Sequence, residues 1–294
     1  MRASWFMGLL ETFAFEPPPP GPGAWNSLAH MPTSRFAFAF GAPGDGRIYA
    51  AGGAISGAGT AVNERYNPST NSWSTAASML ETHSNAATGT PGTNMFVAFG
   101  MVNGVRSTAN RRYSPGANSW SAVASGATAR TDVAGVSIGG MFHALGGFDG
   151  ASVRNSHHRY NPGGNAWTSL ATMPTARRSA AAGAPGNGRF YVVGGSPLTT
   201  ANDEYNPETN TWASRAPFPE STSNLAVGTP GNGRLYAVKV MSSGRTDEYN
   251  PATNMWRGVA HFPFGTGPRA ASLGNGRFNV HCATGRHAEY MPGV

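Results

Sequence analysis

At five places in this chain a tyrosine is followed seven residues later by a tryptophan, and this recurrence constrains the fold more than any other feature. The pairs are Tyr66/Trp73, Tyr113/Trp120, Tyr160/Trp167, Tyr205/Trp212 and Tyr249/Trp256. Successive tryptophans lie 47, 47, 45 and 44 residues apart. Trp25 has no tyrosine seven residues before it, and Tyr290 has no tryptophan after it. The chain thus begins with the last part of a repeat and ends with the first part of one. This arrangement predicts a closed ring of units.

Each repeat contains the pattern of four short strands. A small apolar segment such as residues 36–40 comes first, and a glycine-rich turn such as residues 41–46 follows it. Tight hairpins need glycine because the residues at their central positions adopt positive φ. The side chains of the second segment alternate in type, and this segment often ends in two glycines. The third segment carries the tyrosine. A Pro-x-x-Asn turn then leads to the tryptophan segment. The pattern predicts one four-stranded antiparallel sheet for each repeat.

The period and the order of these motifs resemble the kelch repeat, whose period is about 50 residues. The residues that carry the resemblance are the Tyr/Trp pairs, Met-Pro-Thr at 31 and 173, and the glycine pairs Gly52–Gly53, Gly146–Gly147 and Gly194–Gly195. Three repeats depart from the glycine pair, with Phe99–Gly100, Lys239–Val240 and His281–Cys282 in its place. We expect less regular loops at those three positions.

The resemblance implies an all-β fold, a six-bladed β-propeller of four-stranded antiparallel blades. The segment around Trp25 would supply the fourth strand of the sixth blade and so close the ring. We expect residues 1–23 to form a disordered or linker-like tail and residues 24–294 to form the kelch-type propeller. The regular aromatic residues are interpreted as packing residues between blades, because a sugar-stacking site would need irregular positions.

The basic side chains are almost all arginine. The net charge is +7, although charged residues make up 12% of the chain, and Lys239 is the single lysine. Arginine is suited to forked contacts with carboxylate, phosphate or sulfate groups. A bias in genomic base composition would produce the same excess, and both explanations stay open here.

The resemblance also implies where a ligand would bind, because kelch propellers generally use the face formed by the entrances to the first strands and the loops between second and third strands. Ten residues are candidates for that face: Arg35, His83, Arg106, Arg130, Arg154, Arg177, Arg178, Arg245, Arg269 and Arg286. Converging arginines predict an anionic partner, either an acidic peptide or an acidic glycan. In the alternative interpretation, the arginines cap the blade ends by bonding backbone carbonyls.

No catalytic motif is evident. The chain lacks a phosphate-binding glycine loop, a Gly-x-Ser-x-Gly elbow and an HExxH pattern. His281, Cys282 and His287 are too few to predict a metal site. We therefore expect a non-enzymatic interaction scaffold with no catalytic residues, metal or cofactor. The enzyme alternative resembles a bacterial sialic acid mutarotase, also a six-bladed kelch ring, with His83 and either Asp132 or Glu81 as the acid/base pair.

Other properties narrow the expected partners. The basic residues are spread evenly over the repeats, which argues against nucleic acid. No segment is long and apolar enough to predict a membrane span. The short apolar run from Trp5 to Leu10 is interrupted by Glu11, so we expect no signal peptide and leave the compartment open, with the cytoplasm as default. Cys282 stands alone, which excludes an intrachain disulfide. A protein or an acidic glycan is the expected partner of a monomer.

Overall fold

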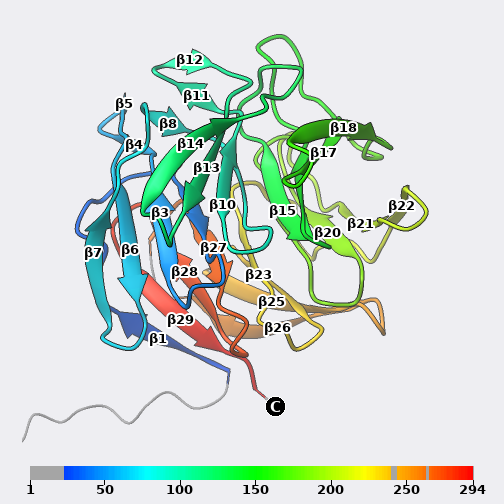
Figure 1. Cartoon of the computed structure of the whole chain (residues 1–294). Helices are drawn as coiled ribbons and strands as arrows, with labels where there is room; N and C mark the ends of the chain where they lie inside the picture. The colour runs from blue at the N-terminus through cyan, green and yellow to red at the C-terminus, as the bar shows by residue number, and fades with distance from the viewer. Residues whose placement is uncertain (1–22, 240–243, 263–264, 294) are drawn as a thin grey trace, which may run out of the picture.

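The computed structural model describes residues 23–239, 244–262 and 265–293, and within these ranges all regular structure is β-strand (Figure 1). These residues form six four-stranded antiparallel sheets and two smaller ones. The predicted all-β class is therefore confirmed. Apart from Gly23, the segment predicted as a tail lies outside the described residues.

The first three large sheets follow one another along the chain. The first contains, in order, β2 (Ala39–Gly41), β3 (Ile48–Ala51), β6 (Asn63–Asn67) and β7 (Ser72–Ala76). The second contains β9 (Ala87–Gly89), β10 (Met95–Ala98), β13 (Asn110–Ser114) and β14 (Ser119–Val123). The third contains β15 (Ala134–Ile138), β16 (Met141–Leu145), β17 (His157–Asn161) and β18 (Ala166–Leu170).

The other three large sheets repeat this order, except that the last takes its fourth strand from the start of the chain. The fourth contains β19 (Ala181–Gly183), β20 (Phe190–Val193), β21 (Asn202–Asn206) and β22 (Thr211–Ser214). The fifth contains β23 (Ala226–Gly228), β24 (Leu235–Val238), β25 (Arg245–Asn250) and β26 (Met255–His261). The sixth contains β27 (Arg269–Ser272), β28 (Phe278–His281), β29 (His287–Met291) and β1 (Ala24–Leu28).

The two aromatic residues left single in the sequence are partners in the sixth sheet. Trp25 on β1 lies opposite Tyr290 on β29, in the register that joins Tyr66 to Trp73 in the first sheet. The Trp25 ring also packs against Phe262 and Phe278, with ring centroids 4.6 Å and 5.5 Å away. The first and last described strands are thus held together by a cross-strand aromatic pair.

The tyrosine, asparagine and tryptophan of one repeat form a clasp with the segment that leads into the repeat. In the first sheet the Tyr66 hydroxyl donates to Oδ1 of Asn71 at 2.9 Å. The same Oδ1 accepts the amide of Ala29, whose carbonyl accepts Nε1 of Trp73 at 2.8 Å. Asn71 adopts a φ of 45°, which asparagine tolerates better than most residues. The clasp recurs with Tyr113/Asn118/Trp120, Tyr160/Asn165/Trp167, Tyr205/Asn210/Trp212 and Tyr249/Asn254/Trp256. The interpretation of these aromatics as packing residues is confirmed.

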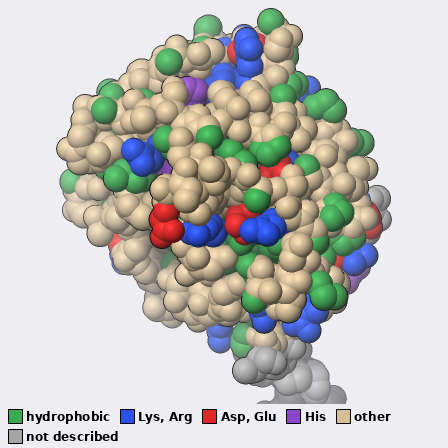
Figure 2. Space-filling model, turned by 90° about the vertical axis from the view of Figure 1, so that its right-hand side faces the viewer, with side chains coloured by type: hydrophobic (Ala, Val, Ile, Leu, Met, Phe, Trp, Pro, Cys, Tyr) green, Lys and Arg blue, Asp and Glu red, His purple; other side chains and the backbone are tan. Residues whose placement is uncertain are grey.

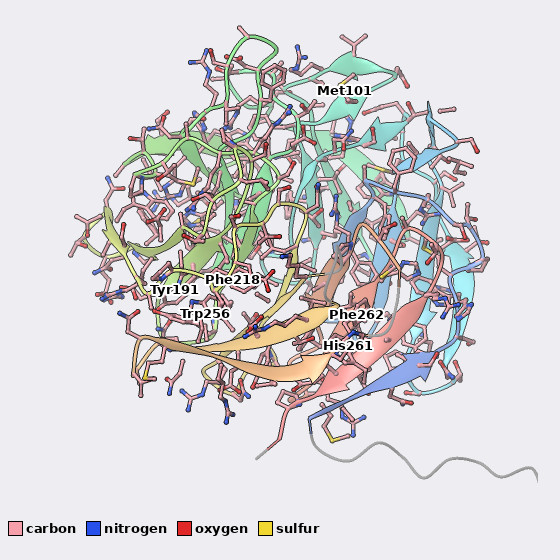
Figure 3. All side chains as sticks on the ribbon, turned by 180° about the vertical axis from the view of Figure 1, so that it is seen from behind. Met101, Tyr191, Phe218, Trp256, His261 and Phe262 are labelled. Atoms are coloured by element: carbon pink, nitrogen blue, oxygen red, sulfur yellow. The ribbon has the colours of Figure 1, made fainter. Side chains whose placement is uncertain are left out.

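The hydrophobic core lies between neighbouring sheets, where the side chains of one sheet pack on the next. Figure 3 labels Tyr191, Phe218 and Trp256, which belong to one such cluster. The rings of Phe218 and Trp256 meet edge to face with centroids 4.9 Å apart. Along the inner edge, β2 lies against β9 and β27, β15 against β9 and β19, and β23 against β19 and β27.

A chain of backbone hydrogen bonds runs just before the first strands, and we call it the belt. Its members are Ala37, Asn85, Asp132, Ser179 and Asn224, all with φ between 52° and 57°. The amide of each of the last four donates to the carbonyl of the member before it, at 2.9–3.1 Å. The belt therefore joins the first five sheets through main-chain bonds that do not depend on side-chain identity.

The expectation of a less regular loop at Phe99–Gly100 is wrong. Phe99 has a φ of 63°, close to the 65° of Gly52 and the 62° of Gly146 at the matching positions. The following hairpin is regular: β11 (Met101–Val102) pairs with both β12 (Val105–Arg106) and β8 (His83–Ser84). The buried Phe99 ring packs at 5.2 Å from Trp167 and so offsets the backbone strain.

Candidate functional site

The loops between second and third strands gather at one side of the molecule and define what we call the loop face. The short strands β8, β11 and β12 and the hairpin of β4 (Ala54–Ile55) with β5 (Ala58–Gly59) lie there, at the top of Figure 1. In the view from behind, Met101 of β11 marks the same edge (Figure 3). Because the strands are antiparallel, the entrances to the first strands share this side.

Two of the candidate arginines are buried and paired within their own sheets. Nη1 of Arg35 donates to Oε2 of Glu64 at 2.8 Å, and its Nη2 donates to a carbonyl of β3. Nη2 of Arg177 donates to Oδ2 of Asp203 at 2.6 Å and to a carbonyl of β20. Burial lowers the pKa of both arginines, and the paired carboxylates oppose this effect. Both side chains are closed off from solvent. Their bonds match the alternative interpretation, in which arginines cap the sheets.

Arg130 is also buried, but it has no ion pair with any carboxylate in the described part of the chain. Its Nη1 donates to Oγ of Ser156 at 2.6 Å, and its Nη2 lies 3.1 Å from Nδ1 of His158. The guanidinium carbon lies 4.6 Å from the ring centroid of Phe99, in cation–π geometry. Burial and the nearby charge of Arg154 lower the pKa of Arg130 to about 10. We leave Arg35, Arg130 and Arg177 out of the proposed site because a ligand does not reach them.

His83 is buried as well, with Nε2 against the carbonyl of Phe99, and burial lowers its pKa. Glu81 is engaged with Arg111, whose Nε donates to its carboxylate at 2.6 Å. The acid/base pair of the enzyme alternative is therefore not presented to a substrate, because its histidine is enclosed by protein.

The loop face does carry a half-buried pair of arginines around one aromatic ring, which we call the arginine–phenylalanine stack. The guanidinium carbons of Arg106 and Arg178 lie 5.6 Å and 5.0 Å from the ring centroid of Phe148. Backbone bonds between Phe148 and Thr131 hold the ring in place. Gly150 makes the close approach possible, because a Cβ there would lie 2.4 Å from Nη1 of Arg106. The stack brings together residues from three successive repeats.

The remaining loop-face arginines differ in how far they are already neutralised. Nε of Arg154 donates to Asp149, whose carboxylate also accepts two backbone amides, and these bonds lower the pKa of Asp149 to about 2. Nε of Arg245 donates to Asp247 at 2.7 Å. Arg286 is exposed. The structure thus brings Arg106, Arg154 and Arg178 into one neighbourhood, with one aspartate already bound to Arg154.

Arg269 does not lie at the entrance to its strand, where the sequence placed it. Gly267 has a positive φ of 62° and matches the position of Ala37, so the residue that matches Arg35 is Gly265. Arg269 lies on β27 opposite His281, where the first sheet has Ala39 opposite Ala51. It therefore belongs to the inner edge of the sixth sheet.

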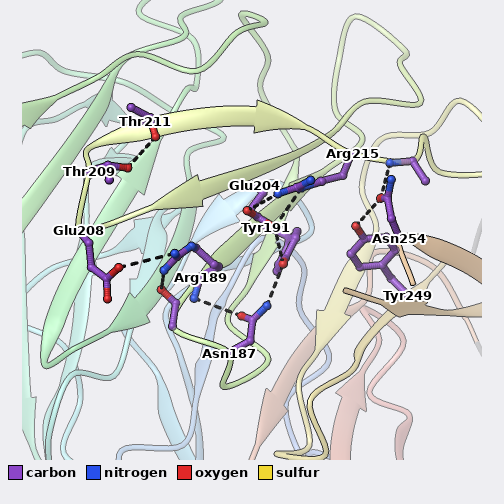
Figure 4. A network of polar contacts seen from close by, with 12 residues as sticks. Asn187, Arg189, Tyr191, Glu204, Glu208, Thr209, Thr211, Arg215, Tyr249 and Asn254 are labelled. Atoms are coloured by element: carbon purple, nitrogen blue, oxygen red, sulfur yellow. Dashed lines mark hydrogen bonds and ion pairs between the residues drawn. The ribbon is translucent and has the colours of Figure 1, made fainter. Parts of the chain in front are cut away.

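The opposite side of the sheets has basic residues that are paired with acids. Nη2 of Arg189 lies 3.6 Å from Glu208, while Glu204 accepts both Arg215 and the Tyr191 hydroxyl (Figure 4). On the side shown in Figure 2, acidic and basic side chains likewise lie next to each other on a mostly uncharged surface. Such pairs contribute little to binding because they neutralise each other.

The comparisons with known protein families find two matches to the Kelch motif, at residues 40–80 and 129–174. This is a kelch-repeat protein. The first match spans most of the first sheet, and the second begins just before Arg130 and runs through the third sheet. A search of curated proteins gave no match.

Kelch repeats generally mediate protein–protein interactions. The described residues of this kelch protein contain no cluster of three or more histidine, cysteine or acidic side chains able to hold a metal ion. Nor do they form a helix long and apolar enough to cross a membrane.

The kelch sheets enclose neutral histidines, which makes the fold sensitive to acid. Burial lowers the pKa of His143 to about 4 and those of His157 and His281 to about 3, all below the ordinary 6.5. The unfolded chain therefore takes up protons first as the pH falls below 6.5. We expect the free energy of unfolding to decrease by roughly 1.4 kcal/mol per pH unit for each of these histidines between about pH 6 and pH 4. Urea unfolding over this pH range measures the slope.

A matched variant tests the same effect at one position. Nδ1 of His157 lies 3.2 Å from the Ala171 carbonyl, as Nδ2 of Asn63 donates to the Ala77 carbonyl in the first sheet. His157→Asn should therefore keep this bond and reduce the dependence of stability on pH. An unchanged slope in this variant would contradict the assignment.

Proposed function

We propose that this chain is a monomeric, six-bladed kelch propeller that serves as a non-enzymatic interaction scaffold for an acidic protein segment. Residues 24–294 would form a single ring closed by β1. The order of the six sheets, the neighbour contacts of their first strands and the Trp25/Tyr290 pair support this architecture. An acidic glycan is the alternative ligand, with the same charge requirement.

The observation that carries the proposal is the arginine–phenylalanine stack on the loop face. Arg106 has no ion pair with a described carboxylate, and Nη1 of Arg178 lies 3.9 Å from Asp132, which is a loose contact. Both guanidinium groups lie beside the same ring, so a carboxylate bound there would be attracted by both. The half-buried Phe148 adds an apolar surface of the kind found in binding hot spots.

The test is a binding screen against acidic peptides and against carboxylated or sulfated glycans at ~150 mM salt, where charges beyond about 8 Å are screened. The variant Arg106→Gln with Phe148→Ala should weaken binding of an acidic peptide at least tenfold. Arg178 is kept in this variant so that Asp132 keeps its partner.

A control that removes one more positive charge than the stack variant separates the stack from overall charge. Arg47→Gln with Arg189→Gln removes two charges from the opposite side of the sheets and should leave binding unchanged. Equal losses in both double variants would show non-specific attraction. Binding by the glycans but not the peptides would replace the protein partner with the alternative ligand.

A further inference from the structure

The inner edges of the sheets enclose a cavity with a volume of about 450 Å³, which we call the central cavity. Parts of all six first strands line it, and most of the lining residues are small. Among these lining residues, Asp132 and Arg269 are the charged ones. They come from separate parts of the inner edge, since β15 lies against β9 and β19 whereas β27 lies against β2 and β23.

Arg269 is an exception to the repeat. The matching positions on the other first strands are all alanine: Ala39, Ala87, Ala134, Ala181 and Ala226. Five sheets therefore pair their inner strands with a methyl group at this position, so the strand pairing does not require a guanidinium group there. The presence of an arginine at this position therefore has a cause other than strand pairing.

Of the two charged side chains that line the central cavity, Arg269 has no ion pair. Nη1 of Arg269 donates to the carbonyl of Pro268 at 3.0 Å, and Arg269 makes no ion pair with a described carboxylate. Asp132 already accepts the hydroxyl of Thr131 at 3.3 Å and lies 3.9 Å from Arg178. Burial lowers the pKa of Arg269, and the charge of Asp132 opposes that decrease. Asp132 is thus already in contact with Thr131 and Arg178, whereas no ion pair with a described carboxylate balances the charge of Arg269.

We propose that the central cavity binds a single carboxylate group, held by Arg269. A guanidinium group presents parallel N–H donors that match the two oxygens of a carboxylate. One bound carboxylate would balance the charge of Arg269, whereas a phosphate dianion would overcompensate it. Ser179 and Asn224 also line the cavity and can supply further hydrogen bonds. The volume falls within the range of known small-molecule pockets, so the cavity has room for a small organic acid or an acidic side chain.

The carboxylate has two possible sources, a free small acid or an acidic side chain of a bound peptide. This proposal does not depend on peptide binding at the arginine–phenylalanine stack, because Arg269 lies on the inner edge and not in the stack. Acetate is the probe for the free acid. A peptide with capped ends and one glutamate is the probe for the side chain.

The experiment is a titration of the full chain with each probe, followed by calorimetry or by NMR of the probe. Arg269→Ala should weaken binding at least tenfold, and it should fold normally because it restores the alanine of the other repeats. Asp132→Asn should strengthen binding, since it removes the competing negative charge and keeps a residue that tolerates a φ of 57°. Melting curves of both variants report on folding.

The outcomes are separable. Acetate binding that depends on Arg269 supports a free acid, and peptide binding alone that depends on Arg269 supports the acidic side chain. Binding of neither probe, or equal binding by wild type and Arg269→Ala, overturns the proposal. The Arg106→Gln, Phe148→Ala variant should still bind acetate, so failure at the stack and failure in the central cavity are distinguishable.

Discussion

Replacing Arg35, Arg130 and Arg177 together by methionine is expected to abolish the folded state. Glu64 and Asp203 would be left buried without a partner, and breaking a buried pair costs roughly 3–5 kcal/mol each. The two pairs together would cost about as much as the whole stability of an ordinary domain, about 5–15 kcal/mol. Circular dichroism and thermal melting of the triple variant measure this directly.

The single variants should rank in a definite order. Arg35→Met and Arg177→Met should destabilise the chain more than Arg130→Met, because Arg130 leaves no described carboxylate unpaired. Arg35→Met combined with Glu64→Leu should recover much of the loss. Arg47→Gln, Arg112→Gln and Arg189→Gln together form the charge-matched control, and this variant should melt like the wild type. A triple buried variant that melts normally would show that these arginines do not stabilise the fold.

Deleting residues 1–30 is expected to cause a similarly severe loss, through a different mechanism. The deletion removes β1, so that β29 becomes an open edge and Phe262, Phe278 and Tyr290 lose the Trp25 ring. An exposed edge strand pairs readily with other chains, so we expect self-association as well as a lower melting temperature. Light scattering and thermal melting provide the two readouts.

Two comparisons isolate the contribution of β1. Deleting residues 1–22 alone keeps the strand and should leave the melting temperature unchanged. Trp25→Ala keeps the backbone pairing and should cost about 3 kcal/mol, the lower end of the range for a buried tryptophan, because Trp25 is half-buried. A monomeric 31–294 fragment with unchanged melting would contradict the proposed ring closure.

The sheets were predictable because the sequence signal and the structural cause coincide. Each tyrosine lies opposite its tryptophan on the neighbouring strand, and the asparagine between them completes the clasp. The seven-residue spacing therefore reflects the strand pairing, the turn and the packing at once. The hairpin after Phe99 was mispredicted because motif reasoning treats a missing glycine as lost regularity. In the structure, packing of the phenylalanine ring offsets the strain.

The candidate site was harder to predict because loop position does not reveal burial. Arg35 and Arg177 point into their own sheets, toward acids on the third strand that lie two residues before a tyrosine. The sequence does contain a signal for these ion pairs. In the repeats with these arginines, Glu64 lies two residues before Tyr66, and Asp203 lies two residues before Tyr205. The irregular segment 265–268 hid the register of Arg269, which the strand pairing and the backbone angles resolve.

The antiparallel pairing of β1 with β29 has a mechanical consequence. Ala24 lies opposite Met291, and the amide of Gly23 donates to the Met291 carbonyl at 2.7 Å, so both strands leave the sheet at one corner (Figure 1). A force that pulls these two strand ends apart would load the ladder one bond at a time and unzip it. A force applied at Leu28 and Met291 would instead shear all the bonds of the ladder together. The direction of a tether, and not its attachment strength alone, would decide how much tension the molecule withstands.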